Sequence, residues 1–106
     1  MTNGEYESAI VSEIYKQIKT YHLPLSCYHL RTQDGREVDL LLESEDGFIA
    51  IEIKATENAN RSDAKHLFEL QEILNKPLLH GFVLSNDVRT QHFWGKIKIV
   101  QTMIIL

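Results

Sequence analysis

The 106-residue chain contains one cysteine, two prolines and five glycines. A single cysteine excludes an internal disulfide framework and suits a reducing cytoplasm, where we expect the protein to reside. No apolar run approaches the roughly 20 residues that are needed to cross a bilayer. Residues 1–7 are polar and lack the apolar core of a signal peptide. We therefore expect no membrane among the partners of this chain.

Repeats, low-complexity tracts and linkers are also absent, and the length fits a single domain over residues 1–106. The histidines lack zinc-like spacing, and no phosphate-binding G-x-x-x-x-G-K-[ST] loop is present, which excludes an ATPase site of that type. Hydrophobic residues make up 43% and charged residues 25% of the chain, an ordinary globular composition. The net charge of −4 argues mildly against strong non-specific binding of nucleic acid.

What the sequence does contain is a clear hydrophobic pattern. It predicts a helix, three strands, a second helix and then further strands. A strand that follows a crossover helix indicates a mixed sheet, so we expect an α/β fold with a mixed central sheet flanked by helices. The expected elements are a helix over Glu5–Tyr21 that Pro24 ends, strands over Leu25–Arg31, Glu37–Glu43 and Phe48–Lys54, a helix over Ser62–Leu74 with Ser62 as its N-cap, a strand over Leu78–Leu84, and a last strand or pair of strands over Lys96–Leu106.

Alternation divides the two central strands into an apolar face and a face that carries charge. Counting back from the turn at Gly47, the register places Asp39 opposite Glu52 and Glu37 opposite Lys54. Directly opposed residues have Cβ atoms about 5 Å apart, so Asp39 and Glu52 repel each other unless a cation lies between them. The expected apolar face consists of Val38, Leu40, Leu42, Ile49, Ile51 and Ile53.

A carboxylate pair and a lysine on one sheet face suit the hydrolysis of phosphodiesters. Mg²⁺ takes oxygen ligands and is commonly held by one or two carboxylates together with phosphate and water. Such an ion polarises a phosphoryl oxygen and lowers the pKa of a bound water. Lys54, two residues after Glu52, would stabilise the negative charge that develops on the phosphate.

The same pattern also fits a plain solvated face. In that interpretation Glu37 and Lys54 form an ordinary ion pair, and solvent screens the repulsion between Asp39 and Glu52. Alternation alone favours this interpretation, because polar faces are common. Apolar residues share the charged face, which indicates partial cover and favours a site; they are Leu41, Phe48 and Ala50.

Two strings on these strands, Glu37-Val38-Asp39-Leu40-Leu41 and Ile51-Glu52-Ile53-Lys54, resemble the restriction-endonuclease-like PD-(D/E)xK superfamily. Within it, the chain is similar to the DUF4143 family, the domain found at the C-terminus of many prokaryotic AAA-type ATPases. The likeness spans most of the chain, although Val38 stands where the superfamily's name has proline. It extends to Gly4-Glu5-Tyr6-Glu7, Tyr28-His29-Leu30-Arg31 and Gly81-Phe82-Val83-Leu84-Ser85.

The resemblance implies an α-β-β-β-α-β core and metal-dependent cleavage of nucleic acid, with DNA as partner and Mg²⁺ or Mn²⁺ as cofactor. It implies Asp39 and Glu52 as metal ligands, the backbone carbonyl of Ile53 as a further ligand, and Lys54 as the catalytic lysine. Glu7 resembles the additional acidic residue that some members bring to the metal, although a solvated helix position explains it equally well. A weaker candidate for the same role is Glu13.

A full-length relative would carry an ATPase domain as partner, so residues 1–106 are expected to be an excised domain or a remnant. Two functions remain open from the sequence. One is a metal-dependent nuclease domain, favoured by the intact Asp39, Glu52 and Lys54. The other is a non-catalytic module on the same fold that binds nucleic acid or packs against an ATPase, favoured by the acidic charge and the missing ATPase part.

Overall fold

The computed structural model describes residues 3–56, 59–86 and 92–101. The predicted order of helices and strands is confirmed, and the second and third strands have the predicted bounds. Residues 102–106 of the last expected strand lie outside the described residues. The elements are α1 (Asn3–Thr20), β1 (Ser26–Arg31), β2 (Glu37–Glu43), β3 (Phe48–Lys54), the 3₁₀ helix η1 (Arg61–Ala64), α2 (Lys65–Leu70), β4 (Leu78–Ser85), β5 (His92–Trp94) and β6 (Ile97–Gln101).

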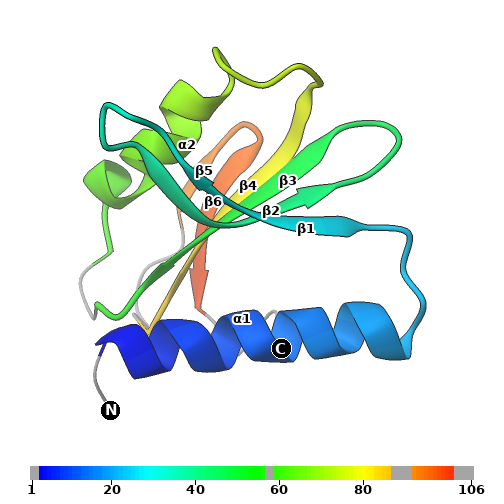
Figure 1. Ribbon diagram of the computed structural model, residues 1–106. Helices are drawn as coiled ribbons and strands as arrows, with labels where there is room; N and C mark the ends of the chain where they lie inside the picture. Colours follow the sequence, from blue (N-terminus) through cyan, green and yellow to red (C-terminus); the bar gives the residue numbers. More distant parts are fainter. Residues whose placement is uncertain (1–2, 57–58, 87–91, 102–106) are drawn as a thin grey trace.

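The strands form one mixed sheet in the order β1-β2-β3-β4-β6-β5. β1, β2 and β3 are antiparallel neighbours, whereas β3, β4 and β6 run parallel. η1 and α2 lie between β3 and β4 in the chain and provide the crossover that a parallel pair requires. α1 crosses one face of the sheet and α2 covers the other (Figure 1). The predicted mixed α/β fold is therefore confirmed.

Helix α1 buries the predicted stripe of isoleucines, Ile10, Ile14 and Ile18. The C-terminal end of α1 is fixed by backbone hydrogen bonds of the residues that directly follow it. His22 has φ 52°, the Leu23 N–H donates to the Ile18 carbonyl (3.0 Å), and the His22 N–H donates to the Lys19 carbonyl (3.3 Å). This is a Schellman motif, in which a left-handed residue satisfies the last carbonyls of the helix. The prediction that Pro24 ends the helix is therefore wrong, because the chain has already left it at Thr20.

The second helix also begins differently from the prediction. Asn60, not Ser62, is the N-cap, because the Asn60 side chain accepts the Ser62 N–H (2.9 Å) while Asp63 accepts the Asn60 N–H (2.9 Å). This capping box opens a 3₁₀ turn, and regular helix covers only Lys65–Leu70. Hydrogen-bonded turns then carry the chain to Leu74, which packs partly buried against the core.

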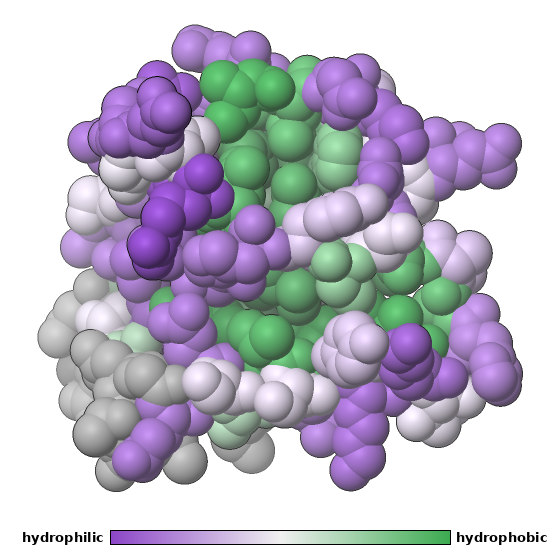
Figure 2. Space-filling view, in the orientation of Figure 1, coloured by the Kyte–Doolittle hydropathy of each residue, from purple (hydrophilic) through white to green (hydrophobic). Residues whose placement is uncertain are grey.

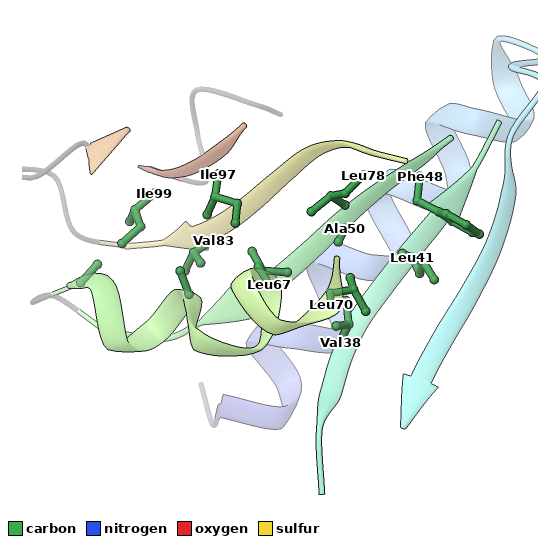
Figure 3. Close-up of a cluster of buried hydrophobic side chains, with 12 residues drawn as sticks. Val38, Leu41, Phe48, Ala50, Leu67, Leu70, Leu78, Val83, Ile97 and Ile99 are labelled. Atoms are coloured by element: carbon green, nitrogen blue, oxygen red, sulfur yellow. The ribbon is translucent and has the colours of Figure 1, made fainter. Parts of the chain in front are cut away.

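Both faces of the sheet are buried. Leu67 and Leu70 of α2 point onto one face, above Val38, Ala50 and Val83 (Figure 3). The other face packs against α1 through Leu40, Leu42, Ile51 and Ile53. Each fully buried leucine or isoleucine contributes about 2 kcal/mol, so both layers stabilise the fold. The expected apolar face is thus wrong in one position, since Val38 lies on the side opposite to Leu40 and Leu42.

In the space-filling view, hydrophobic atoms are visible mainly in hollows on either side of β1 (Figure 2). Within the described part of the chain, no helix is long and apolar enough to span a membrane.

Candidate functional site

A β-bulge in β2 sets the position of Asp39. Tyr28 of β1 pairs with Leu41, but Leu30 pairs with Val38, so β2 contains one residue more than β1 across this stretch. A bulge leaves the extra residue unpaired and re-aims the side chains around it. This explains why Val38 and Leu40 lie on opposite faces of the sheet. The alternation of the sequence does not reveal the bulge, because it does not change the order of apolar and polar residues.

The pairing of β2 with β3 stops at the same place. The predicted register is confirmed from Glu43–Phe48 to Leu40–Ile51. Beyond the Leu40–Ile51 pair, hydrogen bonds from backbone N–H groups to side-chain carboxylates replace the backbone ladder. The Ile53 N–H donates to Asp39 Oδ2 (2.7 Å), and the Asp39 N–H donates to Glu52 Oε1 (3.0 Å).

The carboxylates of Asp39 and Glu52 enter this gap from different sides of the sheet. Glu52 is in register with Val83, which belongs to the cluster under α2. Asp39 lines hollows together with Val11 and Ser12 of α1. The two side chains therefore do not stand side by side on one flat face, as alternation predicted. The bulge turns Asp39 towards α1, and both carboxylates instead reach the strand backbone where the two strands separate.

Glu52 is the buried acid of the site, with only 4% of its surface exposed. Burial is the main cause that raises its pKa to about 7, and the charge of Asp39 adds to the effect. Lys54 lies on the same side, with its Nζ 3.9 Å from Glu52 Oε2, and opposes this shift. The ammonium remains accessible, since 41% of the Lys54 side chain is exposed.

Glu7 of α1 contacts Asp39. A hydrogen bond to the Asp39 side chain is the main cause that raises the pKa of Glu7 to about 7, and burial adds to it. Two carboxyl groups in hydrogen-bond contact need a proton or a cation between them. The structure thus sets Glu7 beside Asp39 on the α1 side of the sheet and Lys54 beside Glu52 on the other side, with the two pairs joined by the hydrogen bond from the Asp39 N–H to Glu52.

Two other sequence expectations gain no support from the structure. Glu37 does not pair with Lys54; its carboxylate contacts Arg31 (3.2 Å) and His29 (3.4 Å), because β2 pairs with β1 at this end rather than with β3. Arg31 accordingly lowers the pKa of Glu37. Glu13 accepts a hydrogen bond from Gln17 on its own helix (3.3 Å) and is not among the residues that line the hollows beside Asp39.

His29 is a site neighbour that the sequence did not indicate. It lies on β1 beside the bulge, with Nδ1 3.4 Å from the Asp39 carbonyl oxygen and Nε2 3.4 Å from Glu37 Oε1. It also lines a hollow of about 310 Å³ together with Glu7 and Asp39. The register of β1 with β2 would have indicated His29, because it places His29 opposite the extra residue of β2.

The donor set suits a hard divalent cation in its chemistry, because carboxylate and carbonyl oxygens are the ligands that Mg²⁺ prefers. The N–H and C=O of one strand residue point to the same neighbour, so the Ile53 carbonyl faces the β2 side, as its N–H does. Among the residues that the structure describes, no three or more His, Cys, Asp and Glu side chains form a group that could hold a metal ion. Water and a substrate phosphate would have to complete the coordination.

Comparison with known proteins identifies a family. No curated protein and no solved structure matches the chain significantly. A family model, described as a domain of unknown function (DUF4143), matches residues 4–105. The matched range includes all the site residues described above, from Glu7 to Lys54. The chain therefore belongs to the DUF4143 family, as its motifs indicated.

Proposed function

We propose that this chain is a PD-(D/E)xK-type domain that hydrolyses phosphodiester bonds in nucleic acid with the help of Mg²⁺ or Mn²⁺. The order α1-β1-β2-β3-α2-β4 agrees with the restriction-endonuclease-like core that the sequence resemblance implies. Because fold alone does not define function, the proposal rests mainly on the site.

The observation that carries the proposal is the negative charge gathered at the open end of the β2–β3 hairpin. Asp39 contacts Glu7 through its side chain and Glu52 through its backbone N–H. The pKa of Glu7 is raised to about 7 mainly by its hydrogen bond to Asp39, and that of Glu52 is raised to about 7 mainly by burial, so both carboxyl groups resist losing their protons. A divalent cation would relieve the repulsion between these carboxylates, and perturbed carboxyl groups of this kind gather at functional sites.

Each residue of the set has a chemical role in such a site. Asp39 and Glu52 would hold the metal ion, together with the Ile53 carbonyl. When bound, the ion would polarise a phosphoryl oxygen and lower the pKa of a bound water. Lys54, accessible beside Glu52, would stabilise the negative charge that develops on the phosphate. Glu7 titrates near neutral pH, so its carboxyl group can take up a proton released at the site.

The partners follow from the same proposal. DNA is the proposed substrate, and an ATPase domain is the proposed partner in full-length relatives. The single cysteine agrees with a cytoplasmic location.

A nuclease assay tests the proposal. The chain is incubated with linear, branched and single-stranded DNA in Mg²⁺ or Mn²⁺, and products are separated on a gel. Lys54→Ala is expected to lower the cleavage rate by about 10²-fold or more, because the charge is lost where the phosphate becomes more negative. Lys65→Ala, at an exposed helix position, is the matched control and should cleave like the wild type. Absence of metal-dependent cleavage by the wild type would refute the proposal, as would full activity of Lys54→Ala.

A second candidate function is a non-catalytic module on the same fold. It is favoured by the hydrogen bonds from the Ile53 and Asp39 N–H groups, since carboxylates that satisfy backbone donors have a structural role that needs no metal. A chain that binds DNA or an ATPase domain without cleaving DNA, and whose stability is indifferent to Mg²⁺, would favour this function.

A further inference from the structure

The outer edge of β1 is free in the part of the chain that the structure describes. β1 is the first strand in the order of the sheet, so the outer N–H and C=O groups of β1 have no neighbouring strand there. It spans six residues without proline, and its one Lys, Arg, Asp or Glu is Arg31 at the end. The opposite edge strand, β5, spans only three residues. Because proteins commonly protect an edge strand by making it short, charged or proline-containing, β5 is protected by its length and β1 is not.

Large apolar side chains are exposed on both sides of this edge. On the α1 side, Tyr15 is 47% exposed and Leu23 is 45% exposed, and both line hollows between α1 and β1. On the α2 side, Tyr28 of β1 is 49% exposed; it is in register with Leu41, and its hydroxyl donates to Glu43 Oε1 (3.1 Å). β1 lies at the front of the view in Figure 1, and Figure 2 shows hydrophobic atoms in the hollows above and below it. A free strand edge with apolar surface on both faces is typical of a contact with another protein chain.

Charge is distributed unevenly along the same edge. Three successive hollows of about 310, 320 and 510 Å³ lie between α1 and β1, and along them α1 runs from residue 7 to 22 while β1 runs from residue 29 back to 26. The hollow at the candidate site is lined by Glu7 and Asp39. The hollow at the other end is lined by Lys19 and His22 and by no carboxylate among the described residues. The edge therefore has an acidic end and a basic end.

We infer that the free edge of β1 pairs with the β1 edge of a second copy of this chain, antiparallel and around a twofold axis near Tyr28. Closed twofold dimers are the commonest symmetric assemblies, and in such a contact a surface meets its own copy. Directly opposed residues of an antiparallel pair lie on the same face of a sheet, so the α1 helices of both copies lie on one face of the joined sheet. Because the second β1 runs in the reverse direction, the acidic end of each copy lies beside the basic end of the other.

This charge pattern selects a second copy as the occupant. An unrelated extended peptide could pair with the same backbone groups, but it would have to bring a base to one end and an acid to the other. A second copy brings both by symmetry. The hollow that holds Glu7 and Asp39 in one copy then continues into the hollow that holds Lys19 in the other. The inference goes beyond the proposed function, because the pairing needs neither a metal ion nor hydrolysis.

Analytical ultracentrifugation of the chain alone, without divalent ions or nucleic acid, tests the inference. The wild type should change from monomer to dimer as its concentration rises. Lys19→Glu should raise the Kd of the dimer at least about tenfold, because symmetry places the reversed charge beside an acidic hollow at both ends of the contact. Lys16→Glu is the matched control, since Lys16 is exposed on the same helix and does not line the hollows. It makes the same change in net charge and should alter the Kd less than about twofold.

Hydrogen exchange then locates the contact. The outward amides of β1 should exchange more slowly in the dimer, because a neighbouring strand accepts them, whereas the amides of β5 should be unchanged. The inference is overturned if Lys16→Glu weakens the dimer as much as Lys19→Glu, or if the dimer leaves the β1 amides unprotected. It is also overturned if the wild type stays monomeric, which would leave the edge to a different protein such as an ATPase domain. A dimer that does not cleave DNA would refute only the proposed function, and a monomer that cleaves DNA would refute only this inference.

Discussion

In the half of the β2–β3 hairpin next to the turn, residues 40–43 pair regularly with residues 48–51, whereas in the half that holds Asp39 and Glu52 the backbone ladder is interrupted. We call these the turn half and the site half. The turn half is held by backbone pairing and by burial of Leu41, Phe48 and Ala50. The site half is held by carboxylates that accept backbone N–H groups. The comparison teaches that stability and chemistry are separated along a single pair of strands.

The largest effect is expected at the turn itself. A Cβ added at Gly47 would lie 2.4 Å from the Pro77 carbonyl oxygen, which also accepts the Phe48 N–H. Because a backbone atom must move, Gly47→Ala should lower the free energy of unfolding by about 3–4 kcal/mol in urea melts. Gly35, at the β1–β2 turn, has φ +90° and no atom within 4 Å of an added Cβ. Gly35→Ala should therefore lower the free energy of unfolding by only about 1–2 kcal/mol, from backbone strain alone. Equal losses in Gly47→Ala and Gly35→Ala would contradict the special role of the turn half.

The next effect concerns pH and the site half. The pKa of Glu52 is about 7 in the folded protein and 4.5 in the unfolded chain, so the folded state prefers the protonated form. The contribution of Glu52 to the free energy of unfolding is fully present below pH 4.5 and is lost as the pH rises through 7. In metal-free protein this loss is roughly 3 kcal/mol. Glu52→Gln should remove this loss and be the more stable protein at pH 8. Melts at pH 5 and pH 8, with and without Mg²⁺, measure the effect; a variant that is less stable than the wild type at pH 8 would make Glu52 a structural residue.

A smaller effect on folding is expected from Asp39→Asn. The amide oxygen can still accept the Ile53 N–H, so the free energy of unfolding should change by about 1 kcal/mol or less. Binding of Mn²⁺, followed by calorimetry or water relaxation, should nevertheless weaken at least about tenfold, since a charged ligand is lost. Equal Mn²⁺ binding by the variant and the wild type would place any metal elsewhere.

The smallest change in stability is expected for Lys54→Ala. Its partner Glu52 is buried but Lys54 is 41% exposed, and solvent screens such a pair, so the loss should stay within about 1 kcal/mol. The substitution should raise the pKa of Glu52 further, because Lys54 now lowers it. An NMR titration of the Glu52 carboxyl group would show this rise, and an unchanged pKa would mean that Lys54 does not act on the site.

The turn half could be predicted from the sequence. Alternation over residues 37–43 and 48–54, with an acidic-glycine turn between them, specifies both strand bounds and the pairing of Leu41 with Ala50. The stripe of isoleucines in α1 likewise specifies the face that packs on the sheet. These features depend on local periodicity, which a single sequence displays directly.

For the site half, the sequence predicted which residues take part but not how they are arranged. Asp39, Glu52 and Lys54 were indicated as a group, but their geometry depends on the bulge, and a bulge leaves no mark on alternation. The ends of the helices were also predicted wrongly. His22 is a weaker end signal than Pro24, and Asn60 and Ser62 are equally good N-cap residues, so residue type alone does not decide between them. His29 escaped notice because its role depends on pairing between strands.

The hydrogen bond from the Ile53 N–H to Asp39 also has a spectroscopic consequence. Most amides in the interior of a sheet exchange with solvent deuterium only as the sheet opens. The Ile53 amide has a carboxylate as its acceptor, so its exchange rate depends on the ionisation and ligation of Asp39 as well as on strand opening. Its resonance is thus a built-in reporter, within the central strand, of whether the site is protonated, charged or occupied by a cation.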